Sequence, residues 1–269
     1  MLVIGENINA SNRSVAEAIA RRDREFLQNL ARAETAAGVD FIDVNAGTGH
    51  VSQEHEAATM EWLVEVVQGV TNRPLVIDSD SPGMIEAALY KYHGERPIIN
   101  SVTAGSEKLV SIGSLAAERQ AWLVALAMGT NGIPDNVEER LAACELIMIH
   151  LTRLGLKAEQ ILFDPLVLPI AVDSTQGLVT LKTIEQIKSR YPAARTVMGL
   201  SNISYGLPNR KLVNRAFLLM AARAGLDAVI LDPLDAKIMS FIKVANMLTG
   251  KDPSCRGYIR THRKGMLLD

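Results

Sequence analysis

Eight short runs rich in Val, Ile and Leu recur along this chain, separated by segments with the composition and spacing of helices. The runs cover residues 2–9, 41–47, 74–80, 97–104, 122–128, 161–169, 196–204 and 228–233. Strands that are apolar on both faces and alternate with helices pair in parallel, because each connecting helix covers a face of the sheet. Eight such units within 269 residues therefore predict an α/β fold of the (β/α)₈ TIM barrel type.

The predicted helices follow the same repeat. They cover residues 14–37, 53–70, 82–92, 106–119, 136–154, 176–190, 209–224 and 235–248, with the weakest pattern over 106–119. Ser14 is the predicted N-cap of the first helix, and Gly38 is its predicted end. A doubly wound open sheet is the structural alternative, but no Gly-x-Gly-x-x-Gly motif follows the first strand.

No linker or low-complexity tract divides the repeat, so we expect residues 1–269 to form a single domain. The basic segment 250–269 departs from the repeat. We expect it to be either a solvated end of the chain or a contact for a partner.

The charge and cysteine content exclude several classes of protein. The 28 basic and 30 acidic residues are well mixed and give a net charge of −2, which argues against nucleic acid or a membrane surface as the main partner. Cys144 and Cys255 lie far apart and predict neither a disulfide framework nor a zinc site. The first run turns polar after four residues, unlike a signal peptide or a membrane span. We expect a cytoplasmic protein.

Polar side chains stand where nearly every predicted strand ends. In a barrel all of these ends converge on the C-terminal rim, where such enzymes place their active sites. Each residue can also be a cap or a turn former: Asp80 is expected to start a helix, and Glu6 and Asp43 are candidates for acids bonded to neighbouring backbone amides. The set consists of Glu6, Asn7, Asn9, Asp43, Asn45, Asp78, Ser79, Asp80, Asn100, Ser101, Asp164, Ser201, Asn202 and Asp232.

The chemistry of these strand ends is that of Asp and Asn. They include no Lys for a Schiff base, no His pair for a transition metal and no Gly-rich phosphate loop. His50 and His55 are interpreted as part of a solvated loop and helix start, and no bound metal is expected. Carboxylates and amides suit a neutral, planar, nitrogen-rich ligand, because a carboxylate accepts two parallel N–H bonds from an amidine-like edge. A pterin has such an edge.

Several motifs carry a family resemblance. "IGENIN", "DVNAG", "MEWLVEVVQ", "LVIDS", "IINSV", "DPLVLP", "GLSNIS" and "NRKLVNRAFLLMA" occur in this order over residues 1 to 250. With these motifs in this order, the chain resembles the methyltetrahydrofolate:corrinoid protein methyltransferases, which are pterin-binding (β/α)₈ barrels. The wider group includes the folate module of cobalamin-dependent methionine synthase and dihydropteroate synthase. The segment after Gly250 matches nothing in the family pattern.

The resemblance implies roles for particular residues. Asp78, Asn100 and Asp164 match the family's pterin-anchoring positions, and Asn202 matches its catalytic amide near the pterin N5. Gly199 and Ser201 are expected to line the same wall, and Arg210 is expected to contact the ring or the glutamate tail.

The resemblance also implies the reaction and the partners. A methyl group passes between N5 of tetrahydrofolate and the cobalt of a cobalamin carried by a separate corrinoid protein, and homologues commonly form homodimers. A neutral amide can donate to N5 or accept from its protonated form, whereas an ionised carboxylate only accepts.

Three other functions are weighed against this reading. Dihydropteroate synthase usually shows a basic Ser-x-Arg near its last strand, where this chain reads "ILDPLDAK". A non-catalytic folate-binding subunit would keep Asp78, Asn100 and Asp164 but would not need Asn202. The third is an unrelated, metal-dependent barrel enzyme with an acidic site.

Overall fold

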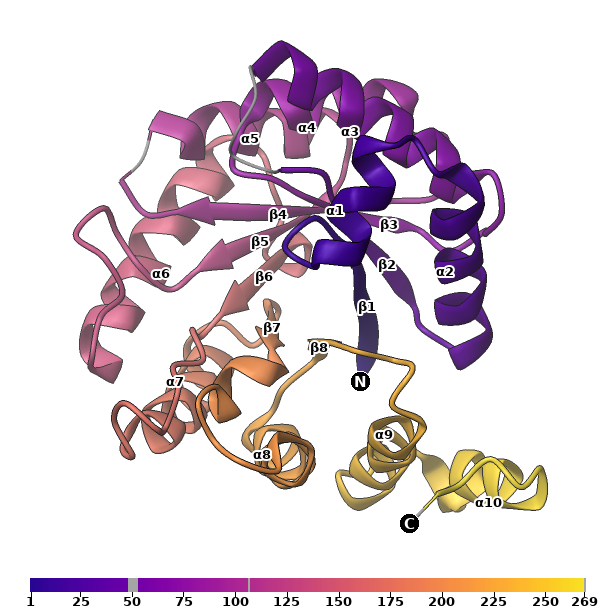
Figure 1. The fold of residues 1–269 in the computed structure, drawn as a ribbon. Coiled ribbons are helices and arrows are strands. Elements are labelled where there is room, and N and C mark those ends of the chain that lie inside the picture. Colours follow the sequence, from indigo (N-terminus) through magenta and orange to yellow (C-terminus); the bar gives the residue numbers. More distant parts are fainter. Residues whose placement is uncertain (48–52, 106, 269) are drawn as a thin grey trace.

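The computed structural model describes residues 1–47, 53–105 and 107–268, and it contains a closed barrel of eight parallel strands in chain order, β8 pairing with β1 (Figure 1). The predicted TIM barrel is confirmed, and the alternative of an open sheet is wrong. The strands are β1 (Leu2–Asn9), β2 (Phe41–Asn45), β3 (Leu75–Asp78), β4 (Ile98–Thr103), β5 (Trp122–Leu126), β6 (Ile161–Asp164), β7 (Arg195–Gly199) and β8 (Ala228–Leu231).

Helices surround the barrel and cover its outer face (Figure 1). They are α1 (Arg13–Ala20), α2 (Arg24–Ala37), α3 (Gln53–Gln68), α4 (Pro82–Lys91), α5 (Glu107–Glu118), α6 (Val137–Arg153), α7 (Gln176–Arg190), α8 (Arg210–Ala224), α9 (Ala236–Leu248) and α10 (Arg256–Arg263). Short 3₁₀ helices lie at η1 (Ala158–Gln160), η2 (Leu200–Ser204) and η3 (Pro253–Cys255). None of the described helices is long and apolar enough to cross a membrane.

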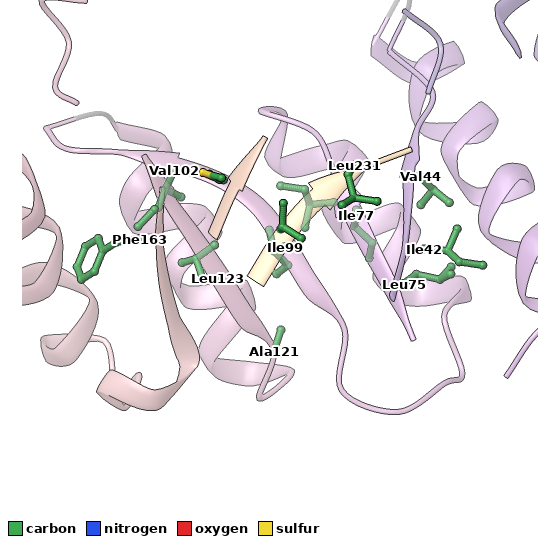
Figure 2. Close-up of a cluster of buried hydrophobic side chains, with 14 of the residues drawn as sticks. Ile42, Val44, Leu75, Ile77, Ile99, Val102, Ala121, Leu123, Phe163 and Leu231 are labelled. Carbon is green, nitrogen blue, oxygen red and sulfur yellow. The ribbon is translucent and has the colours of Figure 1, made fainter. Parts of the chain in front are cut away.

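The barrel interior is filled by one buried apolar side chain from each strand. Successive strand residues point to opposite faces, so the neighbours of these residues face outward and pack beneath the helices, as Ile42, Leu75 and Ile99 do (Figure 2). The interior set is Ile4, Phe41, Val76, Ile98, Val124, Leu162, Val197 and Ala228. This apolar layer fills the barrel interior, and the polar ends of the strands lie above it.

The predicted helix 14–37 is two helices. Arg22, with a φ of 55°, separates α1 from α2. Asn12, not the predicted Ser14, caps α1 by accepting from the Ser14 N–H, and Asp23 caps α2 by accepting from the Phe26 N–H. The prediction is wrong because Asn12 and Asp23 each accept a hydrogen bond from a free backbone N–H at a helix start, so two helices begin here. The apolar spacing runs on through the break and gives no sign of it. Gly38 ends α2 in the left-handed conformation, as predicted.

Most of the predicted strands end one or two residues too late, and two of them extend about five residues beyond the observed strand. The strand predicted over 161–169 ends at Asp164, and the strand predicted over 196–204 ends at Gly199. Residues after Gly199 turn into η2, so Asn202 lies on a 3₁₀ helix above the barrel. Apolar residues that continue beyond a strand end pack in the loop above it and imitate a longer strand in the sequence.

The C-terminal segment folds against the barrel's last helix. Asp252 accepts hydrogen bonds from the N–H groups of Gly257 and Tyr258 and so caps α10. The Leu268 N–H donates to Ser240 on α9 at 2.8 Å, and α10 lies beside α9 (Figure 1). The segment is therefore more structured than a solvated end.

Candidate active site

Four of the residues expected at the site stand on the inner face of the barrel for one geometric reason. Asp78, Asn100, Asp164 and Gly199 each follow an interior residue of their strand by two positions. Because the side-chain period of a strand is two, each shares the inner face with the apolar residue below it. The buried layer therefore forms the floor of a crater, and these residues form its next layer, as inward-pointing layers do in such barrels.

Asp78 and Asn100 are direct neighbours on β3 and β4. The Asn45 amide donates to Oδ2 of Asp78 at 2.9 Å, while Oδ1 has no hydrogen-bond partner among the described residues. Burial raises the pKa of the Asp78 carboxyl, and the hydrogen bond from Asn45 opposes this shift. The Asn100 carbonyl accepts from the Ser79 N–H at 2.7 Å, and the Asn100–Ser101 peptide bond is cis.

Asp164 ends β6 on the other side of the crater. Its Oδ1 accepts from the Leu166 N–H at 2.8 Å, and its second oxygen has no partner among the described residues. Burial raises the pKa of Asp164 to about 6, and the Leu166 N–H and the positive charge of Arg140 both act in the opposite direction. At neutral pH the carboxyl is ionised and has one free acceptor oxygen.

The η2 turn carries the other predicted residues. Arg210 donates to the Ser201 carbonyl at 2.7 Å and to the Ser204 hydroxyl at 3.1 Å, so its guanidinium holds η2 rather than pointing freely into the crater. The Asn202 side chain is exposed and makes no hydrogen bond to the described residues. Gly199 lies beside this amide: a Cβ at Gly199 would be 3.6 Å from the Asn202 amide nitrogen, an ordinary contact distance.

A group of carboxylates lies on the side of the crater formed by β1, β2 and β8. The expectation that Glu6 and Asp43 accept hydrogen bonds from neighbouring backbone amides is wrong. Glu6 has no such partner among the described residues, and Oδ1 of Asp43 is buried without one. Burial, followed by the charge of Asp232, raises the pKa of Glu6 to about 7, and burial raises that of Asp43 well above its usual value. The Glu6 carboxyl therefore changes its protonation state near neutral pH.

Glu34 belongs to this group and was missed in the sequence. It comes from α2, is fully buried, and accepts the Asn7 N–H at 2.9 Å. A Cβ on Gly5 would lie 2.7 Å from its carboxyl group, so a side chain at position 5 would displace the Glu34 carboxyl from this place. Burial raises the pKa of Glu34 to about 7. The signal was its position in the apolar stripe of α2, seven residues after Leu27 and three after Ala31.

The remaining polar strand ends serve the loops. Asn9 accepts the Ser11 N–H, Ser79 accepts the Ser81 N–H, and the Asn7 amide donates to Asp232 at 2.8 Å. Asp80 does not start α4, because Ser81 is its N-cap residue; Asp80 forms an ion pair with Lys108 instead.

Two openings lie on the rim. One of about 360 Å³ is lined by Glu6, Ser201, Arg210 and Asp232 among others. The other, of about 560 Å³, is lined by Asn45, Asp78 and Lys108 among others. Together they place the carboxyl groups of Glu6, Asp78 and Asp232 at openings of the crater, an arrangement that can bind a planar ligand rich in N–H groups.

The described residues contain no group of three or more His, Cys, Asp or Glu side chains placed to hold a metal ion. His50 and the side chain of His55 lie outside the described residues. His150 contacts the Leu146 carbonyl of its own helix at 2.8 Å.

Comparisons with known proteins bear on this site. A family model described as pterin binding enzyme matches residues 5–232. The methylcorrinoid:tetrahydrofolate methyltransferase of Eubacterium limosum is 32% identical over 271 residues, which cover 99% of this chain and 98% of that protein. The methionine synthase of Mycobacterium leprae is 31% identical over 86% of this chain, which corresponds to 20% of that longer protein.

Among solved structures, the 7,8-dihydropteroate synthase of Vibrio fischeri superposes with a TM-score of 0.70 and 17% identity, over 94% of each chain. At that identity the likeness shows the shared barrel alone. The sequence matches are the more specific finding. The chain belongs to the pterin binding enzymes and, within them, to the methyltransferases represented by the Eubacterium limosum protein.

Proposed function

We propose that this protein transfers a methyl group between N5 of tetrahydrofolate and the cobalt of a cobalamin carried by a separate corrinoid protein. The observation that carries the proposal is the inner-face layer of Asp78, Asn100 and Asp164 above the apolar floor, with the free amide of Asn202 on η2. The relative that spans nearly the whole chain supports it, because its name states this pair of substrates.

The pterin ring lies on the crater floor in this proposal. The free oxygens of Asp78 and Asp164 accept N–H groups of the pterin, and the Asn100 amide pairs with a neighbouring ring edge. Each carboxylate keeps one oxygen bound by a protein donor, so its direction is set before the ligand arrives. Such preorganisation reduces the entropy lost on binding.

Asn202 acts on N5. A neutral methylated nitrogen is a poor leaving group, because the C–N bonding pair returns to N5 as the methyl group departs and would leave an anion there. N5 must therefore gain a proton, supplied by water or the surrounding hydrogen-bond network, and a donor aimed at N5 favours that transition state. The Asn202 amide donates to neutral N5 and accepts from protonated N5, and it therefore serves transfer in both directions. The corrinoid cobalt supplies the group that takes up or delivers the methyl.

The other wall residues support Asn202. Gly199 and Ser201 line the wall beside the amide, and Arg210 holds η2 in place through the Ser201 carbonyl. We propose that this support, together with a contact to the ring or to the glutamate tail, is the role of Arg210.

The test is methyl exchange between free methylcobalamin and tetrahydrofolate, followed spectroscopically in both directions. The wild type exchanges methyl groups, and Asn202→Ala slows exchange by about 10² to 10³, as loss of one transition-state donor does, with little change in folate affinity. Asn72→Ala, an exposed asparagine at the opposite end of β3, is the matched control. Unchanged exchange in Asn202→Ala contradicts the role of the amide.

The same assay separates the other functions. Product formed from a pterin diphosphate and p-aminobenzoate would indicate a dihydropteroate synthase. A wild type that binds folate without exchanging methyl groups would indicate a binding subunit. Loss of activity on chelation would indicate a metal-dependent enzyme.

We further propose that the protein is a cytoplasmic homodimer built from one domain, residues 1–269. The packing of α10 on α9 supports the single domain, and the two free cysteines agree with a reducing compartment. An apolar groove of about 390 Å³ between α7 and α8 supports the dimer. Leu178, Leu212 and Met220 line it and are 67%, 61% and 50% exposed, which is unfavourable unless a second surface covers them.

A further inference from the structure

Arg140 is a buried cation that forms no ion pair with a carboxylate of the described residues. It lies on α6, is fully buried, and directs its donors at carbonyl oxygens. Nε donates to the Pro134 carbonyl at 3.0 Å, and Nη1 donates to the carbonyls of Pro165 and Leu166 at 2.9 and 2.8 Å. Nη2 donates to the side-chain oxygen of Gln176 at 2.8 Å. Burial of a charged side chain is costly. The four acceptor oxygens around the Arg140 guanidinium offset that cost and indicate that its position has a specific role.

The residues that Arg140 binds are those that follow Asp164. Leu166 has a φ of 66°, an unusual backbone conformation for a non-glycine residue. Its carbonyl accepts from Arg140 and from the Thr180 hydroxyl at 3.0 Å, and its N–H donates to Oδ1 of Asp164. The Pro165–Leu166 peptide unit links the two charged groups, because its carbonyl accepts from the Arg140 guanidinium and its N–H donates to the Asp164 carboxylate.

We propose that Arg140 is a positioning residue for Asp164: it clamps Pro165 and Leu166 so that the Leu166 N–H fixes one carboxylate oxygen and the other faces the pterin. This inference rests on the proposed function, since it deepens the role of Asp164 as a pterin anchor. Arg140 itself does not touch the ligand. The loop needs the clamp because a left-handed leucine relaxes to an ordinary conformation when nothing holds both its N–H and its carbonyl.

The charge of Arg140 acts in the same direction. Burial raises the pKa of Asp164 to about 6, and Arg140 is the charged group whose field opposes that shift. Arg140 in turn faces Asp164 and Asp135. The neighbouring Cys144 thiol is neutral, because burial raises its pKa to about 12. Removing the cation therefore shifts the titration of Asp164 upward, which a loss of packing alone does not do.

The experiment compares Arg140→Gln, Arg140→Lys and Thr180→Val with the wild type. Tetrahydrofolate affinity is measured by calorimetry as a function of pH, without any corrinoid. The side-chain carboxyl of Asp164 is titrated by ¹³C NMR in the ligand-free protein, with Asp164→Asn assigning the signal. Because the NMR titration involves neither folate nor methyl transfer, its outcome is independent of the proposed function.

Arg140→Gln is expected to weaken folate binding by about 10- to 100-fold, the usual effect of losing hydrogen bonds to a charged group, and to raise the midpoint of the Asp164 titration. Arg140→Lys keeps the charge but lacks the planar fork, so it weakens binding and leaves the midpoint near that of the wild type. Thr180→Val removes the second donor to the Leu166 carbonyl. It keeps the positive charge of Arg140, so the midpoint of the Asp164 titration is expected to stay at the wild-type value.

A folded Arg140→Gln protein with the folate affinity and the Asp164 midpoint of the wild type overturns the proposal. If Arg140→Gln does not fold, Arg140→Lys decides, because wild-type affinity in that variant excludes a role for the fork. If the wild type binds tetrahydrofolate but does not exchange methyl groups, the proposed function fails and the role of Arg140 stands.

Discussion

At the scale of single residues, the proposed role of Asp164 as a pterin anchor predicts that protonation of its carboxyl controls ligand binding. Burial raises its pKa to about 6, and only the ionised form accepts two N–H groups. The carboxylate form is favoured in the complex, so tetrahydrofolate affinity is expected to be constant above about pH 7 and to fall by up to about tenfold per pH unit below the pKa. Calorimetry between pH 5 and 8 measures this dependence.

Asp164→Asn removes the titrating group. It is expected to bind tetrahydrofolate weakly at every pH, because its amide NH₂ faces the N–H edge of the pterin. Glu138→Gln, an exposed position on α6, serves as the control and keeps the profile of the wild type. A wild-type profile in Asp164→Asn would assign the pH dependence to another group.

At the scale of elements, α2 contributes more than cover for the barrel, because its residue Glu34 reaches the crater. Burial raises the pKa of Glu34 to about 7, with the charges of Asp232 and Glu6 adding to the shift and the Asn7 N–H opposing it. The folded state therefore binds the proton more tightly than the unfolded state does. The stabilisation is fully present below the ordinary pKa of a glutamate and is lost as the pH rises through 7.

Glu34→Gln tests this contribution. A shift of this size corresponds to on the order of 3 kcal/mol of unfolding free energy at alkaline pH. Between pH 5 and 8, the free energy of unfolding, measured by urea denaturation, is expected to fall less in the variant than in the wild type. Some decrease with pH remains in the variant, because Glu6 titrates over the same range. Glu25→Gln on the exposed side of α2 is the control. Parallel curves for the wild type and Glu34→Gln would show that folding does not raise the pKa of this carboxyl.

At the scale of the whole molecule, the apolar groove between α7 and α8 predicts self-association. Leu178→Glu is expected to convert a dimer into a monomer, because it places a charge among apolar side chains that the second subunit would bury. Analytical ultracentrifugation measures the change. Leu248→Glu is the matched control, since Leu248 is 69% exposed on α9 and lies outside the groove.

A wild type that sediments as a monomer contradicts the dimer. A Leu178→Glu protein that remains dimeric places the interface elsewhere on the surface.

The sequence predicted most of the barrel and the place of several site residues. Apolar runs on both faces predicted parallel strands, and their polar ends predicted the rim. The sequence did not predict which of the two apolar faces of each strand points inward. The buried interior residues of the structure place Asp78, Asn100 and Asp164 on the inner face, two positions after an interior neighbour. The sequence did not show the break at Arg22 or the early end of β7. In both places the apolar spacing continues in the sequence, although a cap or a loop ends the element in the structure.

What the sequence by itself determined is therefore the repeat, the polar ends of the strands and the family motifs, all of which depend on residues close together in the chain. Only the tertiary structure decided that Glu34 of α2 enters the acid group beside Gly5, and that Arg140 of α6 binds the loop after Asp164. The reason is physical: closing the barrel brings side chains from distant segments into one buried space. Their hydrogen bonds and pKa values depend on that shared burial, which no local spacing encodes.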